Sequence, residues 1–261
     1  MNIIRLFAIS GMILLFVSCG NKKEGFDRLN TISFAEQQVT LGGLLTQRIR
    51  PDSVNYVRES NALTKQLDEM LSASETLRES KSESSWPSLL KHWEEFRMNE
   101  AVLLADTSAN SIFALQKWAR LNSQLLKLTG EVRFGDALEK VIYQSGRPVL
   151  SESFLKSVIY THRDDQIFIN LWGASSINHY HTTGGVIKLI QETDYPSGHE
   201  LTLKCECSDV RYLDVFIRIP EWAVNPTVTH GNVKYVAHPG EYCQVFRKWR
   251  NGDEFSIKLK N

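Results

Sequence analysis

Two histidines and two pairs of acidic residues have the chemistry of metal ligands or of acid–base catalysts. His179 and His181 lie two positions apart, and imidazole is a common zinc ligand. Because no third ligand stands at an evident spacing, we interpret this segment as a solvated turn. Glycoside hydrolysis needs two carboxylates that converge on one bond. The adjacent acids at 94–95 and at 164–165 point in different directions along their elements, so neither pair predicts that chemistry.

Three tryptophans, Trp172, Trp222 and Trp249, are candidate sugar contacts, because the face of an aromatic ring suits the C–H groups of a carbohydrate. Trp222 and Trp249 stand in segments that read as β-strands. There, packing between sheets is the more common role of a large aromatic side chain. We therefore treat these two rings as core candidates first and as sugar contacts second.

The first nineteen residues have the pattern of a lipoprotein signal peptide. Arg5 precedes an apolar stretch at 6–17, and small residues surround Cys19. A basic start, an apolar stretch too short for a stable membrane span and a small-residue cleavage site are typical of secretion. The sequence predicts a signal peptide at 1–18 and a tether at 19–25, with acyl chains on Cys19 holding the protein on a bacterial envelope membrane, the outer membrane by expectation. The alternative is a plain signal peptide or an anchor helix with a chance cysteine.

Composition excludes some partners and limits the covalent chemistry. The chain has 30 Lys and Arg against 30 Asp and Glu, so no basic excess indicates nucleic-acid binding. Its 261 residues suffice for one large or two modest domains. Cys205 and Cys207 lie on the same side of a predicted strand, a poor geometry for a mutual disulfide. We expect them and Cys243 to pack as small apolar side chains, although an oxidising envelope would permit a bond to Cys243.

Before about residue 150 the apolar residues recur with the period of helices. The predicted helical segments are 54–71, 86–102, 112–128 and 134–143. The third segment stops at Gly130, a common C-terminal signal. The stretch 72–85, rich in Ser, Glu and Lys, predicts a solvated helix end or a loop. We expect the aromatic and leucine stripes of these helices to form a helix–helix core.

After residue 150 the period of the apolar residues becomes two. The predicted strands are 166–172, 185–191, 200–207, 213–219, 228–236, 242–249 and 254–259. Short strands separated by Gly, Asn and Pro turns are typical of an antiparallel sandwich. The side chains expected between its sheets are Ile217, Ile219, Trp222, Phe246, Trp249, Phe255 and Ile257.

Four short motifs in this second half occur in a recognisable order. They are Thr-Asp-Tyr-Pro at 193–196, Arg-Ile-Pro-Glu-Trp-Ala at 218–223, Tyr242, and Arg-Lys-Trp-Arg-Asn-Gly-Asp at 247–253. In this order and spacing they resemble the C-terminal β-sandwich region of the β-L-arabinofuranosidases, glycoside hydrolase family 127 and its close relatives. The resemblance implies a sandwich here.

In that family an (α/α) barrel carries the active site ahead of the sandwich. Residues 111–143 resemble the barrel helix pair that leads to the catalytic cysteines. About 130 residues precede the first sandwich strand, enough for four to six helices of roughly 12 residues each. A twelve-helix barrel needs two to three times as many. The resemblance therefore implies a truncated barrel.

The family's chemical residues are altered or missing in this sequence. Residues 106–109 align with a Glu-Thr-Cys motif whose Glu and Cys bind zinc, and here those ligands would be Asp106 and Ser108. Serine is a poor zinc ligand, because its alkoxide is costly to form at neutral pH. The Cys-Cys pair that supplies the nucleophile has no counterpart between 145 and 160. The resemblance thus implies loss of zinc and of the covalent intermediate of a retaining mechanism.

The sequence predicts an α+β protein: a helical region at 26–150 that resembles part of an (α/α) barrel, then an antiparallel β-sandwich at 151–261. We expect a non-catalytic, lipid-anchored envelope protein that binds a glycan or assists a glycan-degrading enzyme, without a cofactor. The alternatives are an active glycoside hydrolase with other carboxylates, and a structural remnant or gene fragment. Converging acids would favour the enzyme, an exposed aromatic platform the binder, and an open apolar face the remnant.

Overall fold

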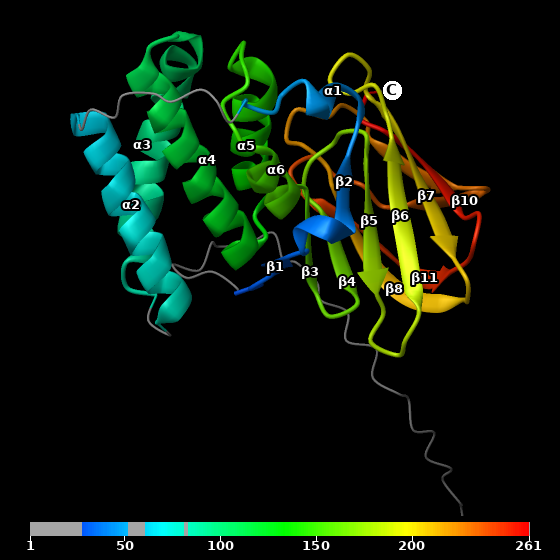
Figure 1. The fold of residues 1–261 in the computed structure, drawn as a ribbon. Helices are drawn as coiled ribbons and strands as arrows, with labels where there is room; N and C mark the ends of the chain where they lie inside the picture. Colours follow the sequence, from blue (N-terminus) through cyan, green and yellow to red (C-terminus); the bar gives the residue numbers. More distant parts are fainter. Residues whose placement is uncertain (1–27, 52–60, 81–82, 261) are drawn as a thin grey trace, which may run out of the picture.

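The computed structural model describes residues 28–51, 61–80 and 83–260. Within these ranges the chain forms six α-helices and twelve strands, and the strands belong to two sheets. Figure 1 shows the helices gathered on one side of the molecule and the sheets on the other. The α+β class predicted from the sequence is therefore confirmed. No helix in the described ranges is long and apolar enough to cross a membrane, and Cys19 and the predicted tether lie outside them.

The predicted helices are present, with shifted ends. The helices are α1 (Gly43–Thr46), α2 (Ala62–Glu79), α3 (Trp86–Ala105), α4 (Ala109–Thr129), α5 (Val132–Gln144) and α6 (Glu152–Ile159). Much of the polar stretch at 72–85 is thus helical and ends α2. Helix α4 ends at Gly130 as predicted, because that residue adopts a φ of 71°, which favours glycine. Helix α6 was not predicted.

The strands are β1 (Ile32–Ser33), β2 (Val39–Leu41), β3 (Tyr160–Arg163), β4 (Gln166–Ile169), β5 (Ser175–Tyr180), β6 (Val186–Glu192), β7 (Glu200–Cys207), β8 (Arg211–Arg218), β9 (Thr227–His230), β10 (Val233–Tyr235), β11 (Tyr242–Trp249) and β12 (Glu254–Lys258). One sheet has the order β1-β3-β4-β8-β11 and the other β10-β9-β12-β7-β6-β5-β2. These neighbours are antiparallel, except β4 and β8, which are parallel.

Apolar side chains of the two sheets meet in a shared core. Successive side chains of a strand point to opposite faces, and alternate residues of β7, β8, β11 and β12 are buried. The ring centroids of Trp249 on β11 and Phe255 on β12 lie 4.7 Å apart, which joins one sheet to the other. Of the side chains predicted between the sheets, those buried are Ile217, Ile219, Trp249, Phe255 and Ile257.

Two predicted core aromatics are not buried. Phe246 is 64% exposed, because it follows the buried Val245 and so points to the outer face of β11. Trp222 is 37% exposed and lies after β8, in the turn that precedes β9. The prediction that both rings pack between the sheets is therefore wrong.

The predicted boundary near residue 150 does not separate helices from sheets. Strand β1 pairs with β3 at one edge of the five-stranded sheet, and β2 pairs with β5 at one edge of the seven-stranded sheet. The segment 32–41 was expected to belong to a helical region. It instead completes both sheets from the other end of the chain.

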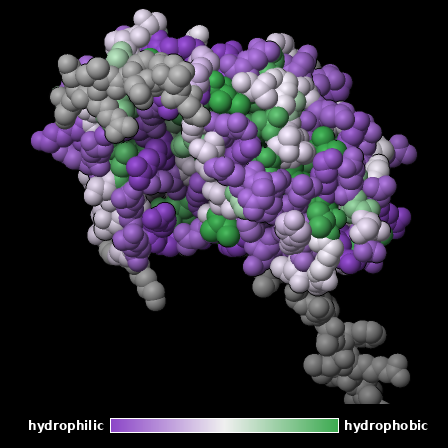
Figure 2. Space-filling view, in the orientation of Figure 1, coloured by the Kyte–Doolittle hydropathy of each residue, from purple (hydrophilic) through white to green (hydrophobic). Residues whose placement is uncertain are grey.

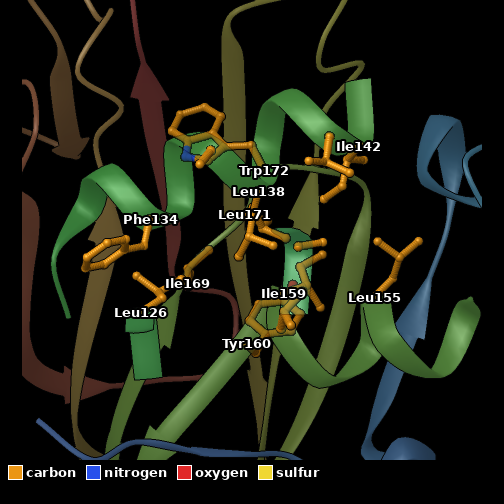
Figure 3. Close-up of a cluster of buried hydrophobic side chains, with 14 of the residues drawn as sticks. Leu126, Phe134, Leu138, Ile142, Leu155, Ile159, Tyr160, Ile169, Leu171 and Trp172 are labelled. Atoms are coloured by element: carbon orange, nitrogen blue, oxygen red, sulfur yellow. The ribbon is translucent and has the colours of Figure 1, made fainter. Parts of the chain in front are cut away.

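A continuous apolar core joins the helices to the sheets. Figure 3 shows part of it, where side chains from α4, α5 and α6 meet those of β3, β4 and the segment after β4. The labelled side chains are Leu126, Phe134, Leu138, Ile142, Leu155, Ile159, Tyr160, Ile169, Leu171 and Trp172. All are buried, so the helical part and the sheets share one core.

A buried charge network, which we call the junction, ties α5 to the end of β8. The guanidinium of Arg218, which is fully buried, donates to the carboxylates of Asp136 and Glu139 and to the carbonyl of Asn170. Tyr195 and Trp222 also donate to Glu139, Trp222 at 3.1 Å. Burial opposes the charge on Arg218, but Glu139 and Asp136 outweigh it, so its pKa is raised.

Cys205, Cys207 and Cys243 are free thiols. Cys205 and Cys243 are buried, as expected for small apolar side chains, and burial raises the pKa of the Cys243 thiol to about 12. Most of the surface in Figure 2 is hydrophilic, and hydrophobic residues there form small separate patches. No large apolar surface is visible on this side.

Candidate functional site

Asp106 and Ser108, the predicted counterparts of zinc ligands, form a helix cap. They lie between α3 and α4, where the Ser108 hydroxyl accepts from the Ser111 amide at 3.2 Å. Asp106 accepts the hydroxyls of Ser111 at 2.6 Å and Ser108 at 3.0 Å, and the Ser108 amide at 2.9 Å. These hydrogen bonds, that of Ser111 foremost, lower the pKa of Asp106. The two side chains therefore accept hydrogen bonds from the otherwise unpaired donors at the start of α4.

The three candidate tryptophans differ in exposure. Trp172 and Trp249 are fully buried, and their indole N–H groups donate to backbone carbonyls of Arg218 and Leu213. Neither ring offers a face to a sugar, which corrects the prediction for these two. Trp222 keeps one part exposed, while its N–H is held by Glu139 in the junction.

The two histidines do not lie in a solvated turn. His179 is on β5 and buried, and its Nε2 lies 2.8 Å from an Asp165 carboxylate oxygen. His181 follows β5, and its Nε2 lies 2.8 Å from the Tyr212 carbonyl. In the described part of the chain no group of three His, Cys, Asp or Glu side chains has the arrangement of a metal site.

The paired acids have separate partners, as expected for residues that point in different directions. Glu94 accepts from Arg97 at 3.0 Å and from Arg133 at 3.2 Å, so it belongs to surface ion pairs. Burial alone would raise the pKa of Asp165, but hydrogen bonds from Thr182 and His179 outweigh it and lower the pKa. Asp165 is thus fixed as a carboxylate beside β5.

An exposed aromatic pair stands on the outer face of the five-stranded sheet. Tyr212 on β8 is 54% exposed and Phe246 on β11 is 64% exposed. Their ring centroids are 5.8 Å apart, and the ring planes differ by 17°. The Lys248 ammonium lies 5.1 Å from the Tyr212 ring centroid. Two nearly parallel, half-exposed rings provide an apolar surface that a sugar ring can contact.

A second aromatic group lies further along the same face. Phe168 and Phe216 stack with centroids 4.5 Å apart, and Tyr242 packs edge-on against Phe168 at 5.7 Å. Positions 212 and 216 are four residues apart on β8, or roughly 13 Å at about 3.3 Å per residue. Phe168 is buried and Phe216 is half-buried, so the exposed aromatic surface on this face is the Tyr212–Phe246 pair.

A polar group separates the two groups of rings. The Gln244 amide donates to both carboxylate oxygens of Asp214, at 3.1 and 2.9 Å, and Gln166 donates at 3.5 Å. Burial raises the pKa of Asp214, and the two amide donors offset this effect only in part. Exposed rings beside a carboxylate and amides form a surface suited to the apolar faces and the hydroxyl groups of sugars.

The aromatic pair borders a cleft of about 810 Å³. Its lining includes Asp164, Asp165, Tyr212, Asp214 and Phe246. We call Tyr212, Phe246, Asp214, Gln244 and this lining the outer-face cleft. It joins the β3–β4 turn to the middle of β8 and β11.

Sequence reasoning did not identify the outer-face cleft. Tyr212 lay just before the predicted strand, and Phe246 was assigned to the core. A signal was present, because the alternation on β8 and β11 buries Leu213 and Val245 and so turns Tyr212, Asp214 and Phe246 outward. The sequence could not show that these residues on two strands lie side by side.

Comparison with known proteins relates the sheets to one enzyme family. Residues 166–261 match the family model described as Beta-L-arabinofuranosidase, GH127 middle domain. No curated protein matches the sequence significantly. The resemblance to family 127 that the sequence motifs predict is therefore confirmed over residues 166–261.

Solved structures give a likeness of fold. A glycoside hydrolase has a TM-score of 0.51 and 19% identity, and a GH127 β-arabinofuranosidase has a TM-score of 0.50 and 19% identity. Each match covers 57% of this chain and 32% of the other. A GH127 β-L-arabinofuranosidase from Geobacillus stearothermophilus T6 gives 0.46, with 20% identity, 58% of this chain and 31% of that one. The matched part spans about a third of the length of these proteins.

Proposed function

We propose that this protein is a non-catalytic glycan-binding relative of the β-L-arabinofuranosidases, held on the bacterial outer membrane by acyl chains on Cys19. The observation that carries the proposal is the outer-face cleft. It combines two exposed, nearly parallel rings with a carboxylate and an amide that keep hydrogen-bonding capacity. The partners that fit are a glycan and, through it, a glycan-degrading enzyme.

Two features support a non-catalytic role. The position of the family's zinc-binding Cys is Ser108, whose hydroxyl and Asp106 partner cap α4. The six described helices are fewer than the twelve of a complete barrel. We infer that these helices are a remnant of the family's (α/α) barrel, and that the two facing sheets correspond to its sandwich.

A glycoside hydrolase that uses other carboxylates is the second candidate, and one observation favours it. Asp165 and Asp214 line the same cleft, and their environments move the two pKa values in opposite directions. Such a difference is typical of a general acid and its partner. However, both Asp165 oxygens already accept from Thr182 and one also from His179, so this carboxylate is occupied by the protein.

The remnant alternative predicts an open apolar face on the helices. Met98 and Val102 on α3 are each 75% exposed, and a groove of about 400 Å³ runs between α2 and α3. Most apolar residues of α3 are nevertheless buried in the shared core. The helices therefore contribute to a folded molecule, and two exposed side chains are a small apolar surface.

The test is a glycan array with the soluble chain that starts after Cys19, alongside a Tyr212→Ala/Phe246→Ala variant. We expect the parent to bind a glycan and the variant to bind it at least about fivefold more weakly, since ring stacking contributes about 0.5 to 1.5 kcal/mol for each ring. Ser256→Ala, on the exposed side of β12 in the other sheet, is the matched control.

The outcomes separate the candidates. Absence of binding to every glycan would contradict the proposal and leave the remnant. Release of reducing sugar that Asp165→Asn and Asp214→Asn both abolish would establish the enzyme instead. For the anchor, incorporation of labelled palmitate that Cys19→Ser removes is expected, and palmitate that persists in that variant would contradict lipidation.

A further inference from the structure

The residues that line the outer-face cleft include more acids than bases. Three carboxylates line it, from Asp164, Asp165 and Asp214, against one guanidinium, from Arg211. Arg211 already donates to the Gly184 carbonyl at 3.1 Å, and its guanidinium lies 3.5 Å from the Asp209 carboxylate. Its charge is therefore shared with an acid outside the cleft.

Asp214 is compensated by neutral donors only. Its donors in the described structure are the neutral amides of Gln244 and Gln166, and it forms no ion pair among the described residues. A carboxylate has about four acceptor sites, so Asp214 retains capacity for hydroxyl donors from a ligand. Two cations lie near this face but are engaged elsewhere. The Lys248 ammonium lies over the Tyr212 ring, and the Arg163 guanidinium donates to the Gln166 amide oxygen at 2.8 and 3.0 Å.

A ligand that stacks on Tyr212 and Phe246 lies next to the carboxylates of the cleft. A sugar hydroxyl can donate to Asp214, whereas a carboxylate or sulfate group on the sugar accepts only and repels the same oxygens. Like charges placed together at an interface suppress the wrong partner. The charge distribution therefore distinguishes sugars by their acidic substituents.

We propose that the outer-face cleft selects glycans without carboxylate or sulfate groups and excludes uronate-containing ones. This inference rests on the proposed glycan-binding function and specifies its ligand class. It assigns the discrimination between neutral and acidic glycans mainly to Asp214. Asp164 and Asp165 add to the negative electrostatic potential of the cleft.

The experiment uses matched pairs of probes with the chain that starts after Cys19. Neutral hexose oligosaccharides, whose C6 hydroxyls are primary alcohols, are compared with the same oligosaccharides after oxidation of those alcohols to carboxylates. We expect the oxidised forms to bind on the order of tenfold more weakly at low ionic strength. At about 0.5 M salt, screening should reduce that ratio to roughly twofold.

Two variants assign the effect to the cleft. Asp214→Asn should reduce the ratio between neutral and oxidised probes, whatever its effect on the neutral affinity. Glu206→Gln removes an acid that is exposed on β7 of the other sheet and paired with Lys188 at 3.0 Å, so the ratio should stay at its parental value. The salt dependence of the parent protein tests the inference without any variant.

Each outcome is decisive. Equal or tighter binding of the oxidised probes overturns this inference and leaves the glycan-binding function standing. An unchanged ratio in a folded Asp214→Asn variant also overturns it. Absence of binding to both members of every pair removes the proposed function and the inference with it.

Discussion

The two ends of strand β8 carry similar residue types in opposite environments. At the junction, Arg218 is fully buried, and Asp136 and Glu139 receive its donors. In the outer-face cleft, Tyr212 is half exposed and Asp214 has only amide donors. A buried network with every group satisfied stabilises the fold, whereas exposed rings beside an incompletely satisfied acid suit a ligand. Composition alone does not distinguish the two roles.

The comparison also separates family resemblance from function. The motif residues Tyr195, Arg218 and Trp222 belong to the junction, so this part of the signature joins a helix to a sheet. Tyr212 and Asp214 lie outside the motifs. A chain can thus keep the signature while the proposed glycan-binding surface lies elsewhere.

The largest effect is expected at the junction. Arg218→Met leaves Asp136 and Glu139 buried without their cation, which typically costs about 3 to 5 kcal/mol. We expect a marked fall in the free energy of unfolding by urea denaturation, or loss of soluble protein. Phe246→Ala in the cleft is the control and should stay within about 0.5 kcal/mol of the parent. A stable Arg218→Met variant would contradict the structural role assigned to the junction.

Two tryptophans provide a graded test of the same contrast. Trp249→Ala empties a fully buried site between the sheets and should cost about 3 to 5 kcal/mol. Trp222→Ala loses one hydrogen bond to Glu139 and partial burial, and should cost about 1 to 2 kcal/mol. Thermal unfolding followed by circular dichroism measures both. Equal losses would show that Trp222 is as much a core residue as Trp249.

The smallest expected effect is the pH dependence of stability that arises from two histidines near the cleft. Burial lowers the pKa of both His162 and His179. Asp165 raises the pKa of His179 and the nearby His181 lowers it, but burial is the largest effect. Both histidines therefore bind protons more readily when unfolded, so stability is lost as pH falls below about 6.5. We expect the melting temperature to fall between pH 6.5 and 5. In His162→Gln the fall should be smaller, and an unchanged pH profile would contradict this assignment.

Much of the fold was predictable because local periodicity reflects burial directly. Strands β7 and β11 have the predicted bounds, 200–207 and 242–249, since alternate apolar residues face one core. Gly130 likewise ended its helix where predicted. Short elements with weak periodicity were missed, among them α6 and β5, whose polar end at His179 was read as a turn.

The candidate site was less predictable, because it depends on contacts between distant residues. The role of His179 follows from Asp165, and that of Trp222 from Glu139, 83 positions earlier in the sequence. Asp106 and Ser108 were located correctly as a motif, but their partner Ser111 reveals the helix cap. No pattern within one strand shows that Tyr212 stacks on Phe246.

The N-terminal strands have a consequence for the order of folding. Ile32 pairs with His162, and Val39 pairs with Ile177, so each sheet gains an edge from a segment made about 130 residues earlier. Closing loops of that length slows folding, because the entropy is lost before the contacts form. During synthesis β1 and β2 cannot pair until their partner strands β3 and β5 have been made. Until they dock, β3 and β5 are open edges available to another chain, so rapid docking protects the protein from aggregation.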